Sequence, residues 1–417
     1  MVQYARGSAP RRRSFGAAAL VATVAAIITV VVATVITAVP AHAAGLTQVS
    51  TFGSNPGNLA MYSYRPDGLP AGRPLVVALH GCTQSANGYF TNSGWQKYAD
   101  LWGFSLVFAE QRSANQSLSC FSWYVDGDIT RGQGEALSIK QMVDYAVSTY
   151  GADPTRVYVT GLSAGGAMSA VMLATYPDVF AGGSIIGGVP YRCSPPASTS
   201  TCQYVGVDKT PQQWGDAVRA AYPGYAGRRP KVAIWHGTAD YTVVVANSAE
   251  SRDQWTNVHG VSTTPTSTRT LPANTTLETF GGDVVRRYTV SGMGHGTPVD
   301  PGPATEQCGS TAAYFLDTIC STYYDAVYFG LGQSTGPTPS PSATSTASPT
   351  PSPTTTASPV CVTANNYQHV QAGRAYHSLG YAYALGSNQN MGLYNTFVTH
   401  TLQQTGTNWW VIADGQC

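Results

Sequence analysis

Short, uninterrupted runs of apolar and β-branched residues recur along much of the chain, and they constrain the fold more than any other feature. The runs lie at residues 74–79, 105–108, 156–160, 183–186 and 231–235. Hydrophobicity that is continuous rather than alternating is typical of parallel strands buried on both faces. Between the second and third runs, apolar side chains recur at helical spacing from Glu135 to Tyr150. We therefore predict a domain of the α/β class, with a mostly parallel sheet and helices on both faces.

The domain organisation follows from a shift in composition near the C-terminus. Residues 334–359 contain only Ser, Thr, Pro, Ala and Gly, so this stretch cannot form a core and is predicted to be a linker. The preceding residues, 44–333, are sufficient for one α/β enzyme domain. The following residues, 360–417, are rich in aromatic side chains and have Arg374 and Asp414 as their only permanent charges. We expect a small, β-rich domain that a disulfide closes, because a unit of this size lacks core area.

The N-terminal residues, 1–43, have the layout of a secretory signal peptide. Four arginines precede an apolar run from Phe15 to Val39, and the pattern Ala41-x-Ala43 is typical of a cleavage site. The apolar run is also long enough to span a bilayer, so an uncleaved anchor is the alternative. The Arg12-Arg13 pair leaves twin-arginine export open beside the general secretory route. We expect cleavage near Ala43 and a secreted, extracellular protein with no stable membrane association.

The charge of the chain excludes some classes of partner. Loss of residues 1–43, which contain four arginines and no acidic residue, changes the formal net charge from +1 to −3. The mature chain therefore lacks the basic surface that nucleic acids require. Charged residues make up 10% of the chain, well below the usual quarter. A neutral, polar surface suits adsorption to an uncharged solid. We also expect the protein to be a monomer.

All of the cysteines lie after the export signal, and their number, eight, is even. In an oxidising compartment this pattern indicates disulfides. Neither a Cys-x-x-Cys motif nor a Cys/His cluster with zinc spacing occurs, so we expect no metal site and no cofactor. Sequence alone leaves the pairing open, but the intervals favour neighbours: Cys82–Cys120, Cys193–Cys202, Cys308–Cys320 and Cys361–Cys417.

The segment from Gly161 to Gly165, with the sequence Gly-Leu-Ser-Ala-Gly, joins a predicted strand to the helix-forming stretch 167–176. It matches G-x-S-x-G in the strand–turn–helix context of the α/β-hydrolase fold, where a strained turn exposes a serine hydroxyl. Glycines are needed at its two ends because side chains there would collide with the neighbouring strand and helix. We predict that Ser163 is a catalytic nucleophile.

A serine hydroxyl needs a histidine that takes its proton and a carboxylate that orients the histidine. In this fold the chain order is serine, acid, histidine. Asp240 follows the strand at 231–235, whereas the other acidic candidates lack such a strand: Asp208, Asp216 and Asp283. His295 lies in a glycine-rich turn after the strand-like residues 284–290, while we expect His259 to be a surface loop residue. We predict the triad Ser163, Asp240 and His295.

Two backbone amides are needed to bind the oxyanion of the reaction. One should come from the residue after the nucleophile, Ala164, and the other from the loop after residues 74–79, with Cys82 as the donor. His80 in this loop has two interpretations, a catalytic group or, as we favour, a ring that supports the loop. Cys82 could also be a nucleophile, but its predicted disulfide argues against that role.

These motifs, taken together, resemble those of extracellular polyhydroxybutyrate depolymerases. The resemblance rests on Leu79–Gln84 (Leu-His-Gly-Cys-Thr-Gln), Gly161–Gly165, His236–Asp240 and Gly292–Pro301, in this order. It covers most of residues 46–330. It implies the α/β-hydrolase fold, the same three residues as the triad, and Cys82 and Ala164 as oxyanion donors.

The resemblance also suggests residues that contact substrate. Cys120–Tyr124 is similar to a segment that lines the substrate crevice of the family, which makes Trp123 a candidate, although Phe121 departs from the tryptophan of the family. Residues 365–374 and 386–395 look like the family's substrate-binding domain. The candidate aromatic residues of the C-terminal region could either contact substrate or fill a small core, and the sequence does not decide between these roles. They are Tyr394, Trp409 and Trp410.

The function that we predict is hydrolysis of poly(3-hydroxybutyrate)-type polyesters through an acyl-enzyme, with the insoluble polyester surface as partner. The alternative is a feruloyl or acetyl xylan esterase that acts on plant cell-wall polysaccharide, because related esterases share the catalytic domain. A non-catalytic adhesion protein with the same fold is a third hypothesis. It predicts that Ser163 does not react with a fluorophosphonate probe.

Overall fold

The computed structural model describes residues 45–332 and 360–415, apart from residues 379, 380, 386, 388, 407 and 408. The chain divides into two compact units, Met1–Pro337 and Thr338–Cys417. The predicted signal peptide, residues 1–43, and the predicted linker, residues 334–359, lie outside the described residues.

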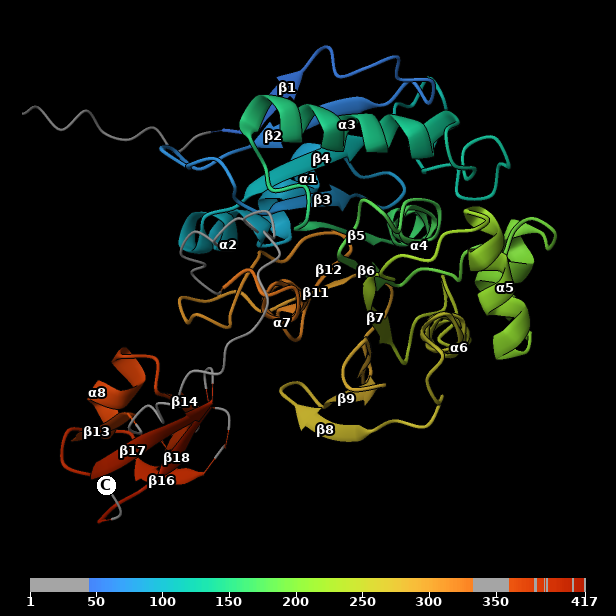
Figure 1. Ribbon diagram of the computed structural model, residues 1–417. Coiled ribbons are helices and arrows are strands. Elements are labelled where there is room, and N and C mark those ends of the chain that lie inside the picture. The colour runs from blue at the N-terminus through green and yellow to red at the C-terminus, as the bar shows by residue number, and fades with distance from the viewer. Residues whose placement is uncertain are drawn as a thin grey trace, which may run out of the picture. The chain divides into compact units, whose positions relative to one another are not determined.

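The first unit is built on one ten-stranded sheet with the order β1-β2-β4-β3-β5-β6-β7-β10-β9-β8 (Figure 1). The central strands from β4 to β10 are parallel, and the strands at both edges are antiparallel. The predicted α/β fold with a mostly parallel sheet is therefore confirmed. The strands are β1 Thr47–Val49, β2 Ala60–Tyr64, β3 Leu75–Leu79, β4 Ser105–Glu110, β5 Val157–Leu162, β6 Gly182–Ile186, β7 Lys231–Gly237, β8 Ser267–Leu271, β9 Thr275–Phe280 and β10 Val285–Val290.

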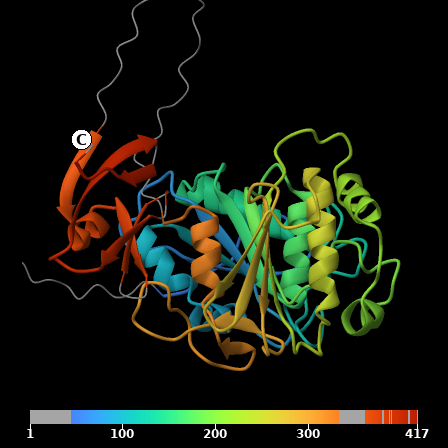
Figure 2. The ribbon, with the colours of Figure 1, turned by 90° about the horizontal axis from the view of Figure 1, so that it is seen from below.

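Helices cover both faces of this sheet, as the two views in Figures 1 and 2 show. Successive side chains of a strand point to opposite faces, so Leu75, Val77 and Leu79 of β3 belong to one core and Val76 and Ala78 to the other. Helices α3, α4, α5 and α6 bury their apolar side chains in the first core, and α1, α2 and α7 in the second. The helices are α1 Ala86–Asn92, α2 Trp95–Trp102, α3 Gly134–Tyr150, α4 Ala164–Thr175, α5 Pro211–Ala221, α6 Ala246–His259 and α7 Ser321–Tyr328.

Each apolar run that predicted a buried strand forms one: β3, β4, β5, β6 and β7. The runs were recognisable because every residue of β3 and β5 is buried. The expectation for His259 was wrong. This residue ends α6 and is partly buried, and its Nε2 lies 2.9 Å from the carbonyl oxygen of Pro230, a contact that ties the helix end to the segment before β7.

The described residues of the second unit form two three-stranded antiparallel sheets and one short helix, so the predicted β-rich domain is confirmed. A small core of alanines, Met391, Leu402 and Trp410 joins them. The elements are β13 Val360–Asn365, α8 Asn366–Gln371, β14 Ala375–Ser378, β15 Tyr381–Ala384, β16 Asn390–Leu393, β17 Thr399–Gly406 and β18 Trp409–Ile412.

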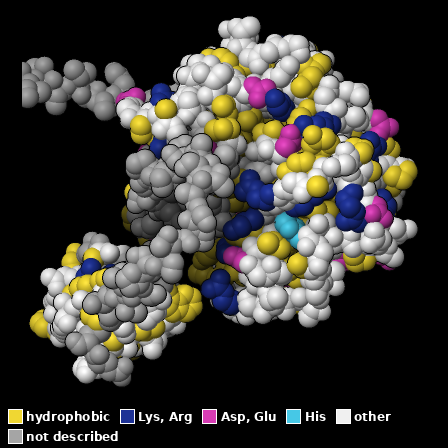
Figure 3. Space-filling view, in the orientation of Figure 1, with side chains coloured by type: hydrophobic (Ala, Val, Ile, Leu, Met, Phe, Trp, Pro, Cys, Tyr) yellow, Lys and Arg dark blue, Asp and Glu magenta, His cyan; other side chains and the backbone are white. Residues whose placement is uncertain are grey.

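Three of the predicted disulfides are present: Cys82–Cys120, Cys193–Cys202 and Cys308–Cys320. The fourth predicted pair, Cys361–Cys417, includes a residue outside the described part of the chain. On the face that Figure 3 shows, charged side chains are scattered among uncharged ones. Across residues 45–332 and the described part of 360–415, no helix is long and apolar enough to cross a bilayer.

Candidate active site

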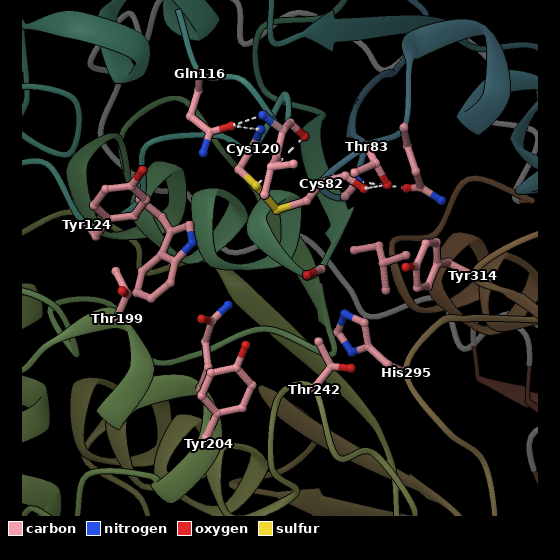
Figure 4. Close-up of a pocket in the computed structure, with 17 residues that line it drawn as sticks. Cys82, Thr83, Gln116, Cys120, Tyr124, Thr199, Tyr204, Thr242, His295 and Tyr314 are labelled. Atoms are coloured by element: carbon pink, nitrogen blue, oxygen red, sulfur yellow. Dashed lines mark hydrogen bonds between the residues drawn. A yellow bond between two sulfur atoms is a disulfide. The ribbon is translucent and has the colours of Figure 1, made fainter. Parts of the chain in front are cut away.

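A cavity of about 520 Å³ opens at the carboxyl ends of the parallel strands (Figure 4). Segments that follow β3, β4, β5, β6, β7 and β10 contribute its lining, which is where ligands bind in open α/β sheets. We call this cavity the crevice. Four residues predicted from the sequence to belong to the site line it: Cys82, Trp123, Ser163 and His295.

Ser163 occupies the tight turn between β5 and α4, with φ 58° and ψ −118°. This backbone conformation is costly for a residue with a side chain, and such strain is typical of functional sites. The turn is possible because glycines flank it. A Cβ atom on Gly165 would lie 2.3 Å from the carbonyl oxygen of Leu79, and one on Gly161 would lie 2.5 Å from the backbone of Gly165. The predicted requirement for small residues therefore has a steric origin.

The structure brings His295 and Asp240 together, although 55 residues separate them. Nδ1 of His295 lies 2.7 Å from Oδ2 of Asp240. The carboxylate follows β7 and is 1% exposed, while the imidazole follows β10 and remains 8% exposed at the crevice. Gly187, at φ 51°, lies beside this pair, since a Cβ atom there would be 3.3 Å from the His295 ring. A carboxylate thus fixes the orientation of an imidazole that shares a cavity with Ser163.

The carboxylate of Asp240 is held in its ionised form by four contacts. Oδ1 accepts hydrogen bonds from the backbone amides of Thr242 (2.9 Å) and Val243 (2.8 Å). Oδ2 is bound by His295 and lies 3.5 Å from Nε2 of His236. Burial alone would raise the pKa of Asp240, but the contacts with His236, His295 and Val243 outweigh it and hold the pKa well below its usual value. His236 was recognised only as part of the motif His236–Asp240, and its contact with the carboxylate was not predicted. Its Nε2 also lies 2.7 Å from the carbonyl oxygen of Val243.

The loop after β3 packs directly against the serine. A Cβ atom on Gly81 would lie 3.4 Å from the Cβ atom of Ser163, so the backbone of this loop approaches the nucleophile closely. The Cys82–Cys120 disulfide ties the loop to the segment after β4. Ala164 is the first residue of α4, and the first amides of a helix have no acceptor within the helix. The amides of Cys82 and Ala164 therefore belong to backbone segments that flank Ser163.

His80 does not line the crevice. It is fully buried, with Nδ1 2.7 Å from the carbonyl oxygen of Gly81 and Nε2 accepting a hydrogen bond from the backbone amide of Gln111 (3.1 Å). Burial lowers the pKa of His80 to about 4, so the ring is neutral at physiological pH. These contacts support the interpretation that the His80 ring stabilises the loop after β3.

Glu135 of α3 holds the segment after β4, which forms one wall of the crevice. This carboxyl group is buried, accepts a hydrogen bond from the backbone amide of Ser122 (2.8 Å) and contacts the side-chain amide of Gln111. Burial raises the pKa of Glu135 to about 7. Glu135 was not singled out from the sequence, because in an amphipathic helix an acidic residue is expected to face solvent.

Aromatic side chains form much of the remaining wall. Trp123 packs edge-on against Tyr124, with 5.5 Å between the ring centroids. Figure 4 shows Tyr124 and Tyr204 on one side of the crevice and Tyr314 on the other. Tyr204 and Tyr314 were not predicted from the sequence, because Tyr204 lies in a short π-helical segment, Thr201–Val205, and Tyr314 lies in a turn. Phe121 is fully buried 5.0 Å from the ring of His80, so its departure from the family does not alter the wall.

The aromatic residues predicted for the second unit differ in exposure. Trp409 is 50% exposed. Tyr394 is partly buried and stacks on His377, with 4.3 Å between the ring centroids. Trp410 is 9% exposed and packs in the core of the unit, so a substrate contact is not supported for this residue. The two tryptophans differ because adjacent side chains of a strand point to opposite faces.

No group of three or more His, Cys, Asp or Glu side chains in the described residues could hold a metal ion. The crevice presents a hydroxyl, an imidazole–carboxylate pair and backbone amides. Such a set can carry out nucleophilic acyl transfer.

Comparison with known proteins places this site among esterases. The sequence profile described as "Esterase PHB depolymerase" matches residues 59–278. Poly(3-hydroxyalkanoate) depolymerase C of Paucimonas lemoignei is 53% identical over 291 residues, which are 69% of this chain and 70% of that protein. Feruloyl esterase B of Talaromyces stipitatus is 37% identical over 305 residues, which are 71% of this chain and 84% of that protein.

A solved structure supports the fold. The acetyl xylan esterase from Aspergillus awamori superposes with a TM-score of 0.60 at 31% sequence identity, covering 69% of this chain and 99% of that chain. The catalytic unit therefore has the architecture of a carboxylic ester hydrolase.

Proposed function

Because this chain belongs to the esterase PHB depolymerase family, we propose that it hydrolyses the ester bonds of poly(3-hydroxybutyrate)-type polyesters. The observation that carries the proposal is the joint opening of Ser163 and the Asp240-bound imidazole of His295 onto one crevice. The 53% identity to a poly(3-hydroxyalkanoate) depolymerase supports the substrate class.

The catalytic steps follow from the contacts in the crevice. The Ser163 hydroxyl attacks the ester carbonyl carbon while His295 takes its proton, and Asp240 stabilises the imidazolium that forms. The negative charge on the carbonyl oxygen is bound by the backbone amides of Cys82 and Ala164. The ester C–O bond then breaks, and the leaving alkoxide takes the proton from His295. Water, activated by the same imidazole, hydrolyses the acyl-enzyme to a free acid and restores Ser163.

The proposal extends to the rest of the chain. We assign residues 1–43 to a signal peptide, residues 44–333 to the esterase domain, residues 334–359 to a linker and residues 360–417 to a domain that binds the polyester surface. Exposed Trp409 and the stacked ring of Tyr394 are candidate contacts, together with Trp123 in the crevice. The protein would act outside the cell as a monomer. Tethering a binding domain to the catalytic domain raises the enzyme concentration at an insoluble substrate.

The experiment that tests this proposal measures clearing of a poly(3-hydroxybutyrate) suspension. The mature chain is compared with its Ser163→Ala variant and with a chain that ends at residue 333. We expect clearing by the mature chain, none by Ser163→Ala, and a sharp decrease for the truncated chain, which should still hydrolyse soluble short-chain esters. Truncation without effect on clearing would contradict the binding role of residues 360–417.

A second candidate function is hydrolysis of feruloyl or acetyl groups on xylan, which the similarity to feruloyl and acetyl xylan esterases favours. The same preparations should be assayed on methyl ferulate and on acetylated xylan. Absence of clearing together with strong activity on either of these would establish the second function in place of the first.

A further inference from the structure

A second cavity, of about 490 Å³, lies in the catalytic unit and shares no lining residue with the crevice. Its volume is within the range of small-molecule sites. Its cationic lining residues are Arg131, Arg192 and Lys209, and the others are uncharged: Thr130, Tyr191, Pro195, Pro196, Ala217, Ala220 and Ala221. A cavity whose charged lining residues are all cationic suits an organic anion.

Two of the three cations are already neutralised. Arg131 forms a bidentate ion pair with Asp178, with distances of 2.7 and 2.8 Å. Arg192 is paired with Asp126. These pairs fix the guanidinium groups at the cavity and leave little net charge for a ligand to balance.

Lys209 has no ion pair with any carboxylate of the described residues. Its ammonium donates to the carbonyl oxygen of Arg192 (3.2 Å) and lies 4.0 Å from the centre of the Trp214 ring. The nearby Glu250 does not line the cavity, and its carboxylate accepts a hydrogen bond from Nε1 of Trp214 (2.6 Å). The same carboxylate accepts a weak hydrogen bond from the backbone amide of Lys209 (3.4 Å). Burial lowers the pKa of Lys209, and the Glu250 carboxylate offsets this effect only in part. Lys209 is therefore the one lining cation whose ammonium has no carboxylate within ion-pair distance among the described residues.

The remaining lining is apolar. Ala217, Ala220 and Ala221 come from one face of α5, and Pro195 and Pro196 line the same cavity. Small side chains leave room for an aliphatic group, while the ammonium can bind a carboxylate with a charge-assisted hydrogen bond. One lining ammonium that is not in direct contact with a carboxylate, together with an apolar lining, matches a short aliphatic monocarboxylate.

We propose that this second cavity binds a short hydroxyalkanoic acid, the class of product that the proposed hydrolysis releases. The identity of the acid rests on the proposed function, whereas the site itself rests on the cavity and its charges. Pro195 and Pro196 belong to the segment closed by the Cys193–Cys202 disulfide, and Thr199 of this same segment lines the crevice. An acid in the second cavity thus lies against the segment that forms one wall of the crevice.

The test is a calorimetric titration of the mature Ser163→Ala protein with sodium 3-hydroxybutyrate. This variant removes turnover, so binding is measured whether or not the chain hydrolyses polyesters. We expect one saturable site, at least tenfold weaker binding by Lys209→Gln, and unchanged binding by Lys140→Gln, a matched change at a lysine paired with Asp144 on the surface of α3. Methyl 3-hydroxybutyrate, which lacks the charge, should not bind this site.

A second variant tests whether Lys209→Gln weakens binding only because it disturbs the structure. Ala220 is exposed on α5 at the edge of the cavity, so Ala220→Glu should fold normally and compete with the ligand through its own carboxylate. Binding that is absent in the parent protein, or that is unchanged by both Lys209→Gln and Ala220→Glu, would overturn the proposal. The latter result would assign the acid to the crevice instead.

Discussion

Asp240→Asn is the substitution whose effect the structure specifies most closely. The backbone amides of Thr242 and Val243 both donate to Oδ1 of Asp240. In the variant these two donors require the carbonyl oxygen of the new amide, so its NH2 group must face Nδ1 of His295. That contact forces the proton of the imidazole onto Nε2. An imidazole with Nε2 protonated cannot take the proton of the Ser163 hydroxyl.

The expected loss is large because the wrong tautomer removes the general base. Such a change lowers kcat about 10⁴-fold, which corresponds to about 5 kcal/mol in the activation free energy. The assay is hydrolysis of p-nitrophenyl butyrate, with kcat and KM measured separately and Tm as a test of folding. We expect kcat to fall while KM and Tm change little. Asp216→Asn, which affects an exposed ion pair with Arg219, is the matched control and should leave kcat unchanged.

A further variant distinguishes the effect of the wrong imidazole tautomer from the effect of losing the negative charge. Asp240→Ala removes the carboxylate but leaves the His295 ring without an imposed proton position. If the imposed tautomer causes the loss, kcat of Asp240→Asn is no higher than that of Asp240→Ala. Activity of Asp240→Asn within tenfold of the parent chain, or well above that of Asp240→Ala, would show that Asp240 does not act by setting the tautomer of His295.

Three other outcomes are expected. Gly165→Ala should lower kcat on soluble esters about 100-fold or more, because the added Cβ would lie 2.3 Å from the Leu79 carbonyl oxygen and displace the serine turn; an unchanged kcat would contradict this. Since the folded pKa of Glu135 is raised to about 7, its contribution to stability is present below about pH 4.5 and is lost as the pH rises through 7. Glu135→Gln should flatten this part of the profile of unfolding free energy against pH, by up to about 3 kcal/mol. Trp410→Ala should destabilise the second unit by about 3–5 kcal/mol, whereas Trp409→Ala should weaken adsorption to polyester without lowering Tm; equal effects on Tm would be inconsistent with their different burial.

The parts of the fold that could be predicted are those in which local sequence and tertiary environment agree. Strand β5 is buried along its whole length and is therefore apolar throughout, and the turn at Ser163 needs glycines that are visible as a motif. The order of serine, acid and histidine then limited the partners to a few residues. Asp240 and His295 could be proposed because each follows a recognisable strand.

Other features depend on contacts that no local pattern encodes. Whether Trp409 or Trp410 faces the core depends on the register of β18 against β17, and a shift by one residue would exchange them. Tyr204 reaches the crevice through a segment whose path is set by the Cys193–Cys202 disulfide. The role of His236 arises only when the chain folds back after β7 and brings Val243 to its ring. These contacts depend on strand register, on a disulfide or on the path of a turn, and no local sequence pattern predicts them.

We expect Ser163 to be the nucleophile for both soluble esters and the polyester. The most direct measurement treats the mature chain with increasing amounts of a fluorophosphonate and determines, by mass spectrometry, the fraction of the Ser163 peptide that is modified. Clearing of poly(3-hydroxybutyrate) and hydrolysis of a soluble ester are measured on the same samples. We predict that both activities fall in proportion to the modified fraction and reach zero together. Clearing that persists when Ser163 is fully modified would contradict the claim.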